Sequence, residues 1–266
     1  DALPICHPKI KAISFTGGTA TGKLISNKTA SSFKKLSLEM GGKNPAVIFA
    51  DCDYMKMLDT VVRSSFSNQG QICLCSSRIL IEESIFEKFI KDFVQRVSEL
   101  KVGDPSIKET QLGALTSKGH FEKVLDYISI AKQEGGKVLT GGNAIKISGR
   151  CGTGWFVEPT IIAGLGNSCR TNQEEIFGPI VTLMPFTTEA EVLNMANKVK
   201  YGLSETLWTN NLTRTMQMSN QLQAGIVWVN TWMMRDLRTP FGGVKASGVG
   251  REGGFEALRF FTEPKN

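Results

Sequence analysis

Apolar residues follow two different periods along this chain, and the two periods alternate. From Met55 to Phe66 they recur at helical spacing, which predicts an amphipathic helix. Residues 46–50 instead form a continuous apolar run, typical of a strand buried on both faces of a parallel sheet. Further helices are expected at residues 23–31, 84–100, 120–133, 189–200 and 213–222, and further strands at residues 11–15, 35–38, 78–81, 137–139, 156–162, 180–184, 205–208 and 225–230. Strands that alternate with helices predict an α/β fold with a parallel sheet, while the glycine-rich residues 141–155 are expected to form a surface loop.

The composition is that of an ordinary globular protein, and it argues against several classes of function. Of the 266 residues, 41% are hydrophobic and 21% are charged. The net charge is +6, but lysine and arginine are scattered rather than concentrated in one stripe, so we expect no nucleic-acid partner. No apolar run approaches the roughly 20 residues that cross a bilayer, so we expect no membrane partner.

The cysteines are too dispersed for a small secreted disulfide scaffold, which indicates a reducing compartment, the cytoplasm. The six are Cys6, Cys52, Cys73, Cys75, Cys151 and Cys169. Cys73 and Cys75 have neither a second cysteine pair nor a nearby histidine at zinc-ligand spacing, so we expect no metal site.

Cys73 is the candidate nucleophile, because it stands between a predicted helix and a predicted strand that could hold its thiol toward a cleft. The alternative is a small buried apolar residue, the commonest fate of a free cysteine. A cysteine–histidine dyad has few candidates, since His7 lies near the start of the chain and His120 within a predicted helix. Glu39, followed by two nearby glycines at the end of a predicted strand, remains as the general base.

Five blocks of sequence resemble, in the correct order, those of the aldehyde dehydrogenase superfamily. They are Phe15-Thr16-Gly17-Gly18-Thr19, Leu38-Glu39-Met40-Gly41-Gly42-Lys43, the run from Phe66 to Cys73 with Gly70-Gln71, Glu174-Glu175-Ile176-Phe177-Gly178-Pro179, and Pro240-Phe241-Gly242-Gly243. The resemblance covers essentially the whole chain. It implies an aldehyde dehydrogenase-like α/β fold, with a partial Rossmann-type cofactor domain and a parallel-sheet catalytic domain. It also implies NAD-dependent oxidation of an aldehyde through a thiohemiacetal and a thioester, with Cys73 as nucleophile and Glu39 as base.

The resemblance assigns cofactor binding to two regions. A glycine-rich turn after predicted strand 11–15 would bring backbone amides to the pyrophosphate of NAD, although such turns also join strands to helices without binding a nucleotide. Glu175 would accept hydrogen bonds from the nicotinamide ribose, with Phe177 beside it, whereas the alternative is a surface glutamate before a turn. The expected cofactor-binding residues are Gly17, Gly18, Thr19, Gly22, Met40, Glu175 and Phe177.

Information about the substrate is concentrated in residues 230–240. This segment resembles the 2-aminomuconic and 2-hydroxymuconic semialdehyde dehydrogenases of the superfamily, in which the arginine matching Arg235 binds a substrate carboxylate. We therefore expect a carboxylate-bearing semialdehyde such as 2-aminomuconate 6-semialdehyde, with Phe241 lining the reacting end of the site. The alternatives are an ion pair of Arg235 with Asp236, a solvated Arg235, core packing for Phe241, and a general aldehyde dehydrogenase for retinal, aliphatic or betaine aldehydes.

The resemblance also divides the chain. We expect residues 1–41 to be the C-terminal part of the NAD-binding domain, residues 42–246 the catalytic domain, and residues 247–266 a segment returning to the cofactor domain. Because members of the family are roughly twice this long and the chain begins at Asp1, we expect a fragment that is inactive alone, whose full-length form is a homo-oligomer, a dimer or a tetramer. Two alternatives remain: a structural protein with vestigial catalytic residues, and a thiol acyltransferase or peptidase domain.

Overall fold

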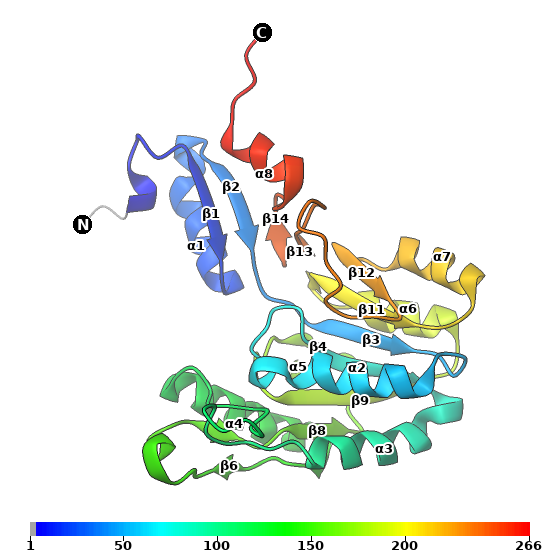
Figure 1. The fold of residues 1–266 in the computed structure, drawn as a ribbon. Helices are drawn as coiled ribbons and strands as arrows, with labels where there is room; N and C mark the ends of the chain where they lie inside the picture. The colour runs from blue at the N-terminus through cyan, green and yellow to red at the C-terminus, as the bar shows by residue number, and fades with distance from the viewer. Residues whose placement is uncertain (1–3) are drawn as a thin grey trace.

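The computed structural model describes residues 4–266, and its largest element is a seven-stranded sheet with strand order β12-β11-β3-β4-β9-β8-β5 (Figure 1). The strands are β3 (Asn44–Ile48), β4 (Ser76–Glu82), β5 (Lys137–Thr140), β8 (Thr160–Ala163), β9 (Ile180–Phe186), β11 (Ser204–Trp208) and β12 (Ile226–Val229). Neighbouring strands are parallel except for β5, which is antiparallel to β8. The predicted α/β fold is confirmed, and the sheet departs from a parallel one only at its β5 edge.

Helices cover both faces of this sheet. On one face, α2 (Tyr54–Phe66) and α3 (Phe86–Ser98) pack in a cluster with Ile79 and Ile81 of β4. The intervening Leu80 belongs to a second cluster, with α6 (Glu189–Asn197) and α7 (Leu212–Gln221). A third cluster joins α4 (Lys118–Gln133) to β8. Burial on both faces explains why these strands are continuous apolar runs. No helix within residues 4–266 is long and apolar enough to cross a membrane.

A smaller, three-stranded sheet joins the two ends of the chain. β1 (Ala12–Thr16) and β2 (Lys35–Glu39) are parallel, and β14 (Gly248–Val249) pairs antiparallel with β2. α1 (Thr19–Thr29) packs on this sheet, and α8 (Gly254–Phe261) lies beside it at the red end of the chain in Figure 1. Residues from the C-terminal end of the sequence therefore hold β2, the strand that ends in Glu39.

Several elements differ from those that the sequence pattern predicts. The expected strand 156–162 divides into β7 (Phe156–Val157) and β8, because Pro159 lies between them and has no N–H group for a strand ladder. β7 pairs with β6 (Ala144–Ile145), so the expected loop 141–155 contains a strand. The pattern also misses short elements, namely α5 (Arg170–Gln173), β10 (Tyr201–Gly202), β13 (Val244–Lys245), β14 and α8. These elements are too short for a hydrophobic period to identify.

Candidate active site

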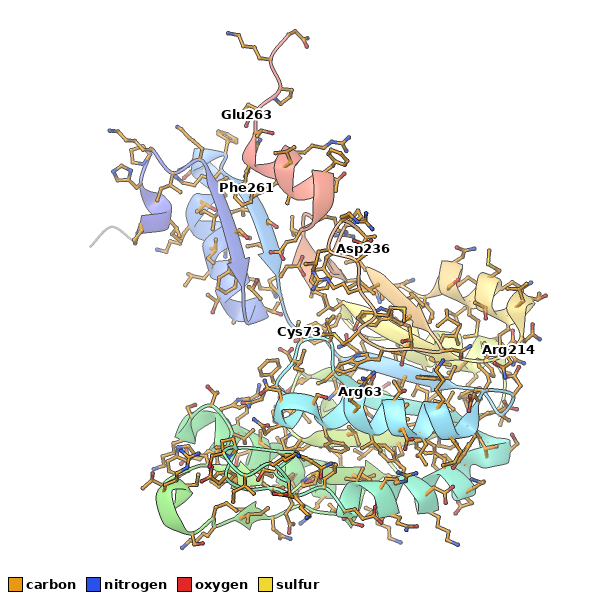
Figure 2. All side chains as sticks on the ribbon, in the orientation of Figure 1. Arg63, Cys73, Arg214, Asp236, Phe261 and Glu263 are labelled. Atoms are coloured by element: carbon orange, nitrogen blue, oxygen red, sulfur yellow. The ribbon has the colours of Figure 1, made fainter. Side chains whose placement is uncertain are left out.

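The turn that carries Cys73 is built from left-handed backbone. α2 ends at Phe66, and the three residues Asn68, Gln69 and Gly70 then have φ angles of +49°, +57° and +71°. A Cβ atom at Gly70 would collide with the carbonyl oxygen of Gly178, so the position requires glycine. Backbone of this kind persists only where its surroundings determine it, and it is concentrated at functional sites. Figure 2 shows Cys73 on this turn, above α2.

A buried asparagine fixes the backbone of the turn. The Asn44 side-chain amide donates to the carbonyl oxygens of Cys73 (2.7 Å) and Cys75 (3.0 Å), and its oxygen accepts from the Ser204 amide (3.2 Å). Asn44 is only 4% exposed. The sequence analysis did not single out this residue, although a polar residue at the start of a fully buried strand is a signal that could have identified it.

The Cys73 thiol is harder to ionise than a free cysteine, because its pKa is raised in the folded chain. Burial raises the pKa of Cys73, the nearby carboxylates of Glu175 and Glu39 raise it further, and the charge of Arg235 opposes them. All six cysteines are free thiols. Cys73 therefore needs a proton acceptor before it can act as a nucleophile.

Glu39 is the nearest candidate for that acceptor by its properties. It is the last residue of β2 and is 4% exposed, and neither carboxylate oxygen has a partner at strict hydrogen-bond geometry within residues 4–266. Burial raises the pKa of Glu39 to about 7 and the negative charge of Glu252 adds to the effect, while the charges of Arg251 and Arg235 and the backbone amide of Gly243 oppose it. A buried carboxyl group that lacks structural partners and titrates near neutral pH has the properties of a general base.

Glu39 and Cys73 line one cavity of about 510 Å³. Its wall also contains most of the expected cofactor-binding residues, namely Gly17, Gly18, Met40, Glu175 and Phe177. The two remaining ones, Thr19 and Gly22, belong to α1 and do not line it. Gly22 instead packs against Met40, where a Cβ atom would collide with the methionine sulfur. The structure thus brings together residues that are up to 160 positions apart in the sequence, from Gly17 to Phe177.

The two glycines after Met40 bring Glu175 to the cavity wall. The Gly42 amide donates to Glu175 Oε1 at 3.0 Å, and a Cβ atom at Gly41 would collide with the same carboxylate. Burial raises the pKa of Glu175, and the Gly42 hydrogen bond opposes this shift. Glu175 is therefore not the surface glutamate considered as an alternative.

Two residues that the sequence analysis left in an ordinary helix also line the cavity. His120 Nε2 is 2.6 Å from the carbonyl oxygen of Phe177, and Lys123 Nζ donates to the carbonyl oxygen of Glu175 at 2.9 Å. Burial lowers the pKa of both side chains. They fix the backbone of the Glu175–Phe177 segment, where Phe177 itself has a φ of +61°.

Arg235 and Phe241 lie outside this cavity, on an aromatic cluster next to Cys73. Phe241 is 8% exposed and packs with Leu74, Trp228 and Trp232, and Cys73 packs against the same cluster. The guanidinium carbon of Arg235 lies 3.8 Å from the centre of the Phe241 ring. The alternative interpretation, in which Arg235 forms an ion pair with Asp236, is wrong, because Asp236 pairs with Arg238. Within residues 4–266 no group of acidic, histidine or cysteine side chains could hold a metal ion.

Comparisons with known proteins agree with the motifs. The sequence matches the aldehyde dehydrogenase family over residues 2–266. The chain belongs to this family. It is 49% identical over 260 residues to a 2-aminomuconic 6-semialdehyde dehydrogenase from a Pseudomonas species, covering 98% of this chain and 53% of the relative. The expected resemblance to semialdehyde dehydrogenases is confirmed.

Solved structures share the fold. HpcC from Thermus thermophilus has a TM-score of 0.94 at 42% identity, covering 97% of this chain and 51% of HpcC. Betaine aldehyde dehydrogenase from Staphylococcus aureus, in complex with NAD+, has a TM-score of 0.90 at 37% identity, covering 95% of this chain and 50% of that one. The chain thus spans about half the length of the curated relatives and solved aldehyde dehydrogenases that it matches.

Proposed function

We propose that this chain forms the thiol site of an NAD-dependent aldehyde dehydrogenase that converts a carboxylate-bearing semialdehyde to the acid. The observation that carries the proposal is that Cys73, Glu175 and Glu39, whose carboxylate has no hydrogen-bond partner at strict geometry among the described residues, line one cavity. A thiol and a carboxyl group with a pKa of about 7 suit covalent catalysis with one shared proton acceptor.

Cys73 and Glu39 divide the chemistry between them. The Cys73 sulfur forms a bond to the aldehyde carbon, and the thiol proton passes to Glu39. The same carbon then loses a hydride and becomes a thioester, and NAD, when bound, supplies the acceptor for that hydride. Glu39 then releases the thiol proton to solvent and is again a carboxylate. It removes a proton from water as the water oxygen bonds to the thioester carbon, the bond between that carbon and the Cys73 sulfur breaks, and the proton returns to the sulfur, which frees the acid and the Cys73 thiol.

The residues of the cavity wall fit a nicotinamide nucleotide. Gly18 has no atom within 4 Å of the position that a Cβ would occupy, so the turn between β1 and α1 leaves open space for a phosphate group. Glu175 uses one oxygen for the Gly42 amide, and its second oxygen can accept from a ribose hydroxyl. Gly17, Met40 and Phe177 line the same cavity and complete the set that would hold the cofactor, while Thr19 and Gly22 lie in α1, the helix that begins at this turn. The related betaine aldehyde dehydrogenase bound to NAD+ supports this choice of cofactor.

Arg235 supports a substrate with an acidic end. Its guanidinium rests on Phe241 beside Cys73 and makes no ion pair within residues 4–266, so its N–H groups are available to a carboxylate. The relative named 2-aminomuconic 6-semialdehyde dehydrogenase supports a substrate of that type. A general aldehyde dehydrogenase is the second candidate, favoured by the apolar side chains of Trp228, Trp232 and Phe241 near the thiol.

Covalent acylation of the Cys73 thiol tests the proposed chemistry. An activated ester such as p-nitrophenyl acetate acylates a nucleophilic thiol without a cofactor, so the chain should release p-nitrophenol in a burst and carry one acetyl group on Cys73. Cys73→Ala should abolish the burst. Cys75→Ala should retain it, because burial raises the pKa of the Cys75 thiol to about 12. A burst that persists in Cys73→Ala would contradict the assignment.

The remaining expectations stay predictions. The division at residues 41/42 and 246/247 is supported by the separation of β1, β2 and β14 from the seven-stranded sheet. The cytoplasmic location, the small-molecule aldehyde as the ligand, and a homodimer or homotetramer for a full-length protein are proposed on the resemblance to the family.

A further inference from the structure

Two of the ten arginines are unpaired within the described residues, and both lie at the aromatic cluster beside Cys73. In that part of the chain, Arg63 and Arg235 make neither a side-chain hydrogen bond nor an ion pair, whereas the other eight make at least one. Arg63 belongs to α2, and its guanidinium carbon lies 5.8 Å from the centre of the Trp232 ring. Arg235 rests on Phe241 in the same way. The two cations are thus supported by rings of one cluster, to which Cys73 also belongs.

The acidic residues nearest to these arginines in the sequence are engaged elsewhere. Asp59, one helical turn before Arg63, pairs with Arg96 of α3 at 3.2 Å. Asp236, next to Arg235, pairs with Arg238. Arg63 is exposed, and it also lines a second hollow of about 260 Å³ between α2 and residues 100–112. An arginine that stacks on a ring while its N–H groups face solvent is preorganised to accept an anion.

Hydrogen bonds fix this arrangement relative to the thiol. Trp232 Nε1 donates to the carbonyl oxygen of Leu74, the residue that follows Cys73, at 3.0 Å. Trp228 Nε1 donates to the carbonyl oxygen of Met234, the residue that precedes Arg235, at 2.8 Å. In the view of Figure 2 the turn with Cys73 lies between Arg63 on α2 and Asp236 on the segment after β12.

We propose that Arg63 is a second specificity-determining residue, which binds the acidic end of the substrate together with Arg235. This inference rests on the proposed function and adds to it a residue from α2, a helix that the semialdehyde motif does not include. Arg63 acts on recognition of the substrate and takes no part in the transfer of the proton or the hydride. Its loss weakens binding of carboxylated compounds and leaves the reactivity of Cys73 toward neutral compounds unchanged.

Affinity alkylation of Cys73 tests this inference in the chain as it stands. N-bromoacetylglycine and N-bromoacetylglycinamide have the same length and the same reactive carbon, and they differ only in the charge of the far end. We expect Cys73, identified by peptide mass, to react faster with the acid than with the amide. Arg63→Gln and Arg235→Gln should each reduce this preference, by about tenfold for one lost charge-assisted contact, and the double variant should abolish it.

The controls separate recognition from structure. Arg63→Lys should retain part of the preference, because it keeps the charge but loses the planar fork. Arg259→Gln, on α8 and paired with Glu256, removes an arginine elsewhere and should leave the preference unchanged. If Arg63→Gln keeps the full preference while Arg235→Gln loses it, the role of Arg63 is overturned and the proposed function stands. If Arg63→Gln slows alkylation of Cys73 equally with the acid and with the amide, the role of Arg63 in recognition is also overturned, since Arg63 would then support the fold. If neither variant changes the preference, Arg235 loses its role too.

Discussion

At the scale of single residues, the unusual group is Glu39, a buried carboxyl without a hydrogen-bond partner among the described residues. The pKa of Glu39 is about 7 in the folded chain and 4.5 in the unfolded chain. Ionised Glu39 therefore lowers the free energy of unfolding, fully above about pH 7 and not at all below about pH 4.5. Glu39→Gln removes that charge. The variant should be more stable at pH 8 by roughly 3 kcal/mol and unchanged near pH 4, as measured by urea unfolding.

The same substitution should harm hydrolysis of the acyl intermediate. Glu39→Gln removes the base from both steps, so Cys73 should be acetylated more slowly by p-nitrophenyl acetate, and the adduct, once formed, should persist and be visible by intact mass. Wild-type turnover in this variant, with no adduct, would show that Glu39 is structural.

A second prediction at this scale concerns the charges around Glu39. After burial, the largest contribution to its raised pKa is the negative charge of Glu252. Glu252→Gln should therefore lower the pKa of Glu39 and move the acidic limb of the ester-hydrolysis profile to lower pH, because the base stays ionised further into acid. Glu256→Gln, on α8 and paired with Arg259, is the matched control and should not move the profile. A shift to higher pH in Glu252→Gln would contradict the assignment of Glu39 as the titrating base.

At the scale of elements, function depends on how α2 ends. Gly70, with a φ of +71° and its Cα facing the Gly178 carbonyl, turns the chain toward Cys73 and β4. Gly70→Ala should cost about 1–3 kcal/mol of unfolding free energy and slow acylation of Cys73, because the turn must shift to admit the methyl group. Gly119→Ala is the control, since Gly119 is exposed in α4 with open space around it and should be neutral or stabilise by up to about 1 kcal/mol. Thermal unfolding and the ester burst measure both effects, and equal behaviour of the two variants would contradict the role of the turn.

At the scale of the whole molecule, the small sheet has an open edge. β1 pairs only with β2 among the described strands, so its other edge carries free backbone donors and acceptors. We expect the 266-residue chain to self-associate with rising concentration, while it keeps the Cys73 ester burst. Ser14→Lys, at an exposed position of β1, should reduce association, because a charge on an edge strand opposes pairing. Light scattering checks the prediction, and a chain that stays monomeric as its concentration rises would contradict it.

The class of fold, the family and the identity of the candidate residues could all be predicted from the sequence. The alternation of periods predicted most helices and strands, because strands buried on both faces and amphipathic helices leave a repeating signal in neighbouring residues. Cys73, Glu39 and Glu175 were identified by short motifs, each of them local in the chain.

Which of these residues lie together, and which groups surround them, depends on the tertiary structure. Contacts between distant segments have no local pattern, so the Asn44 hydrogen bonds to the Cys73 turn and the place of His120 at the cavity wall could not be predicted. The split of strand 156–162 at Pro159 and the pairing of β14 with β2 depend in the same way on partners far along the chain. The sequence named Arg235, but Arg63 is distinguished only by its position on the Trp232 ring and by the pairing of Asp59 with another arginine. Burial, the cause of the raised pKa of Glu39, is likewise a property of the folded chain.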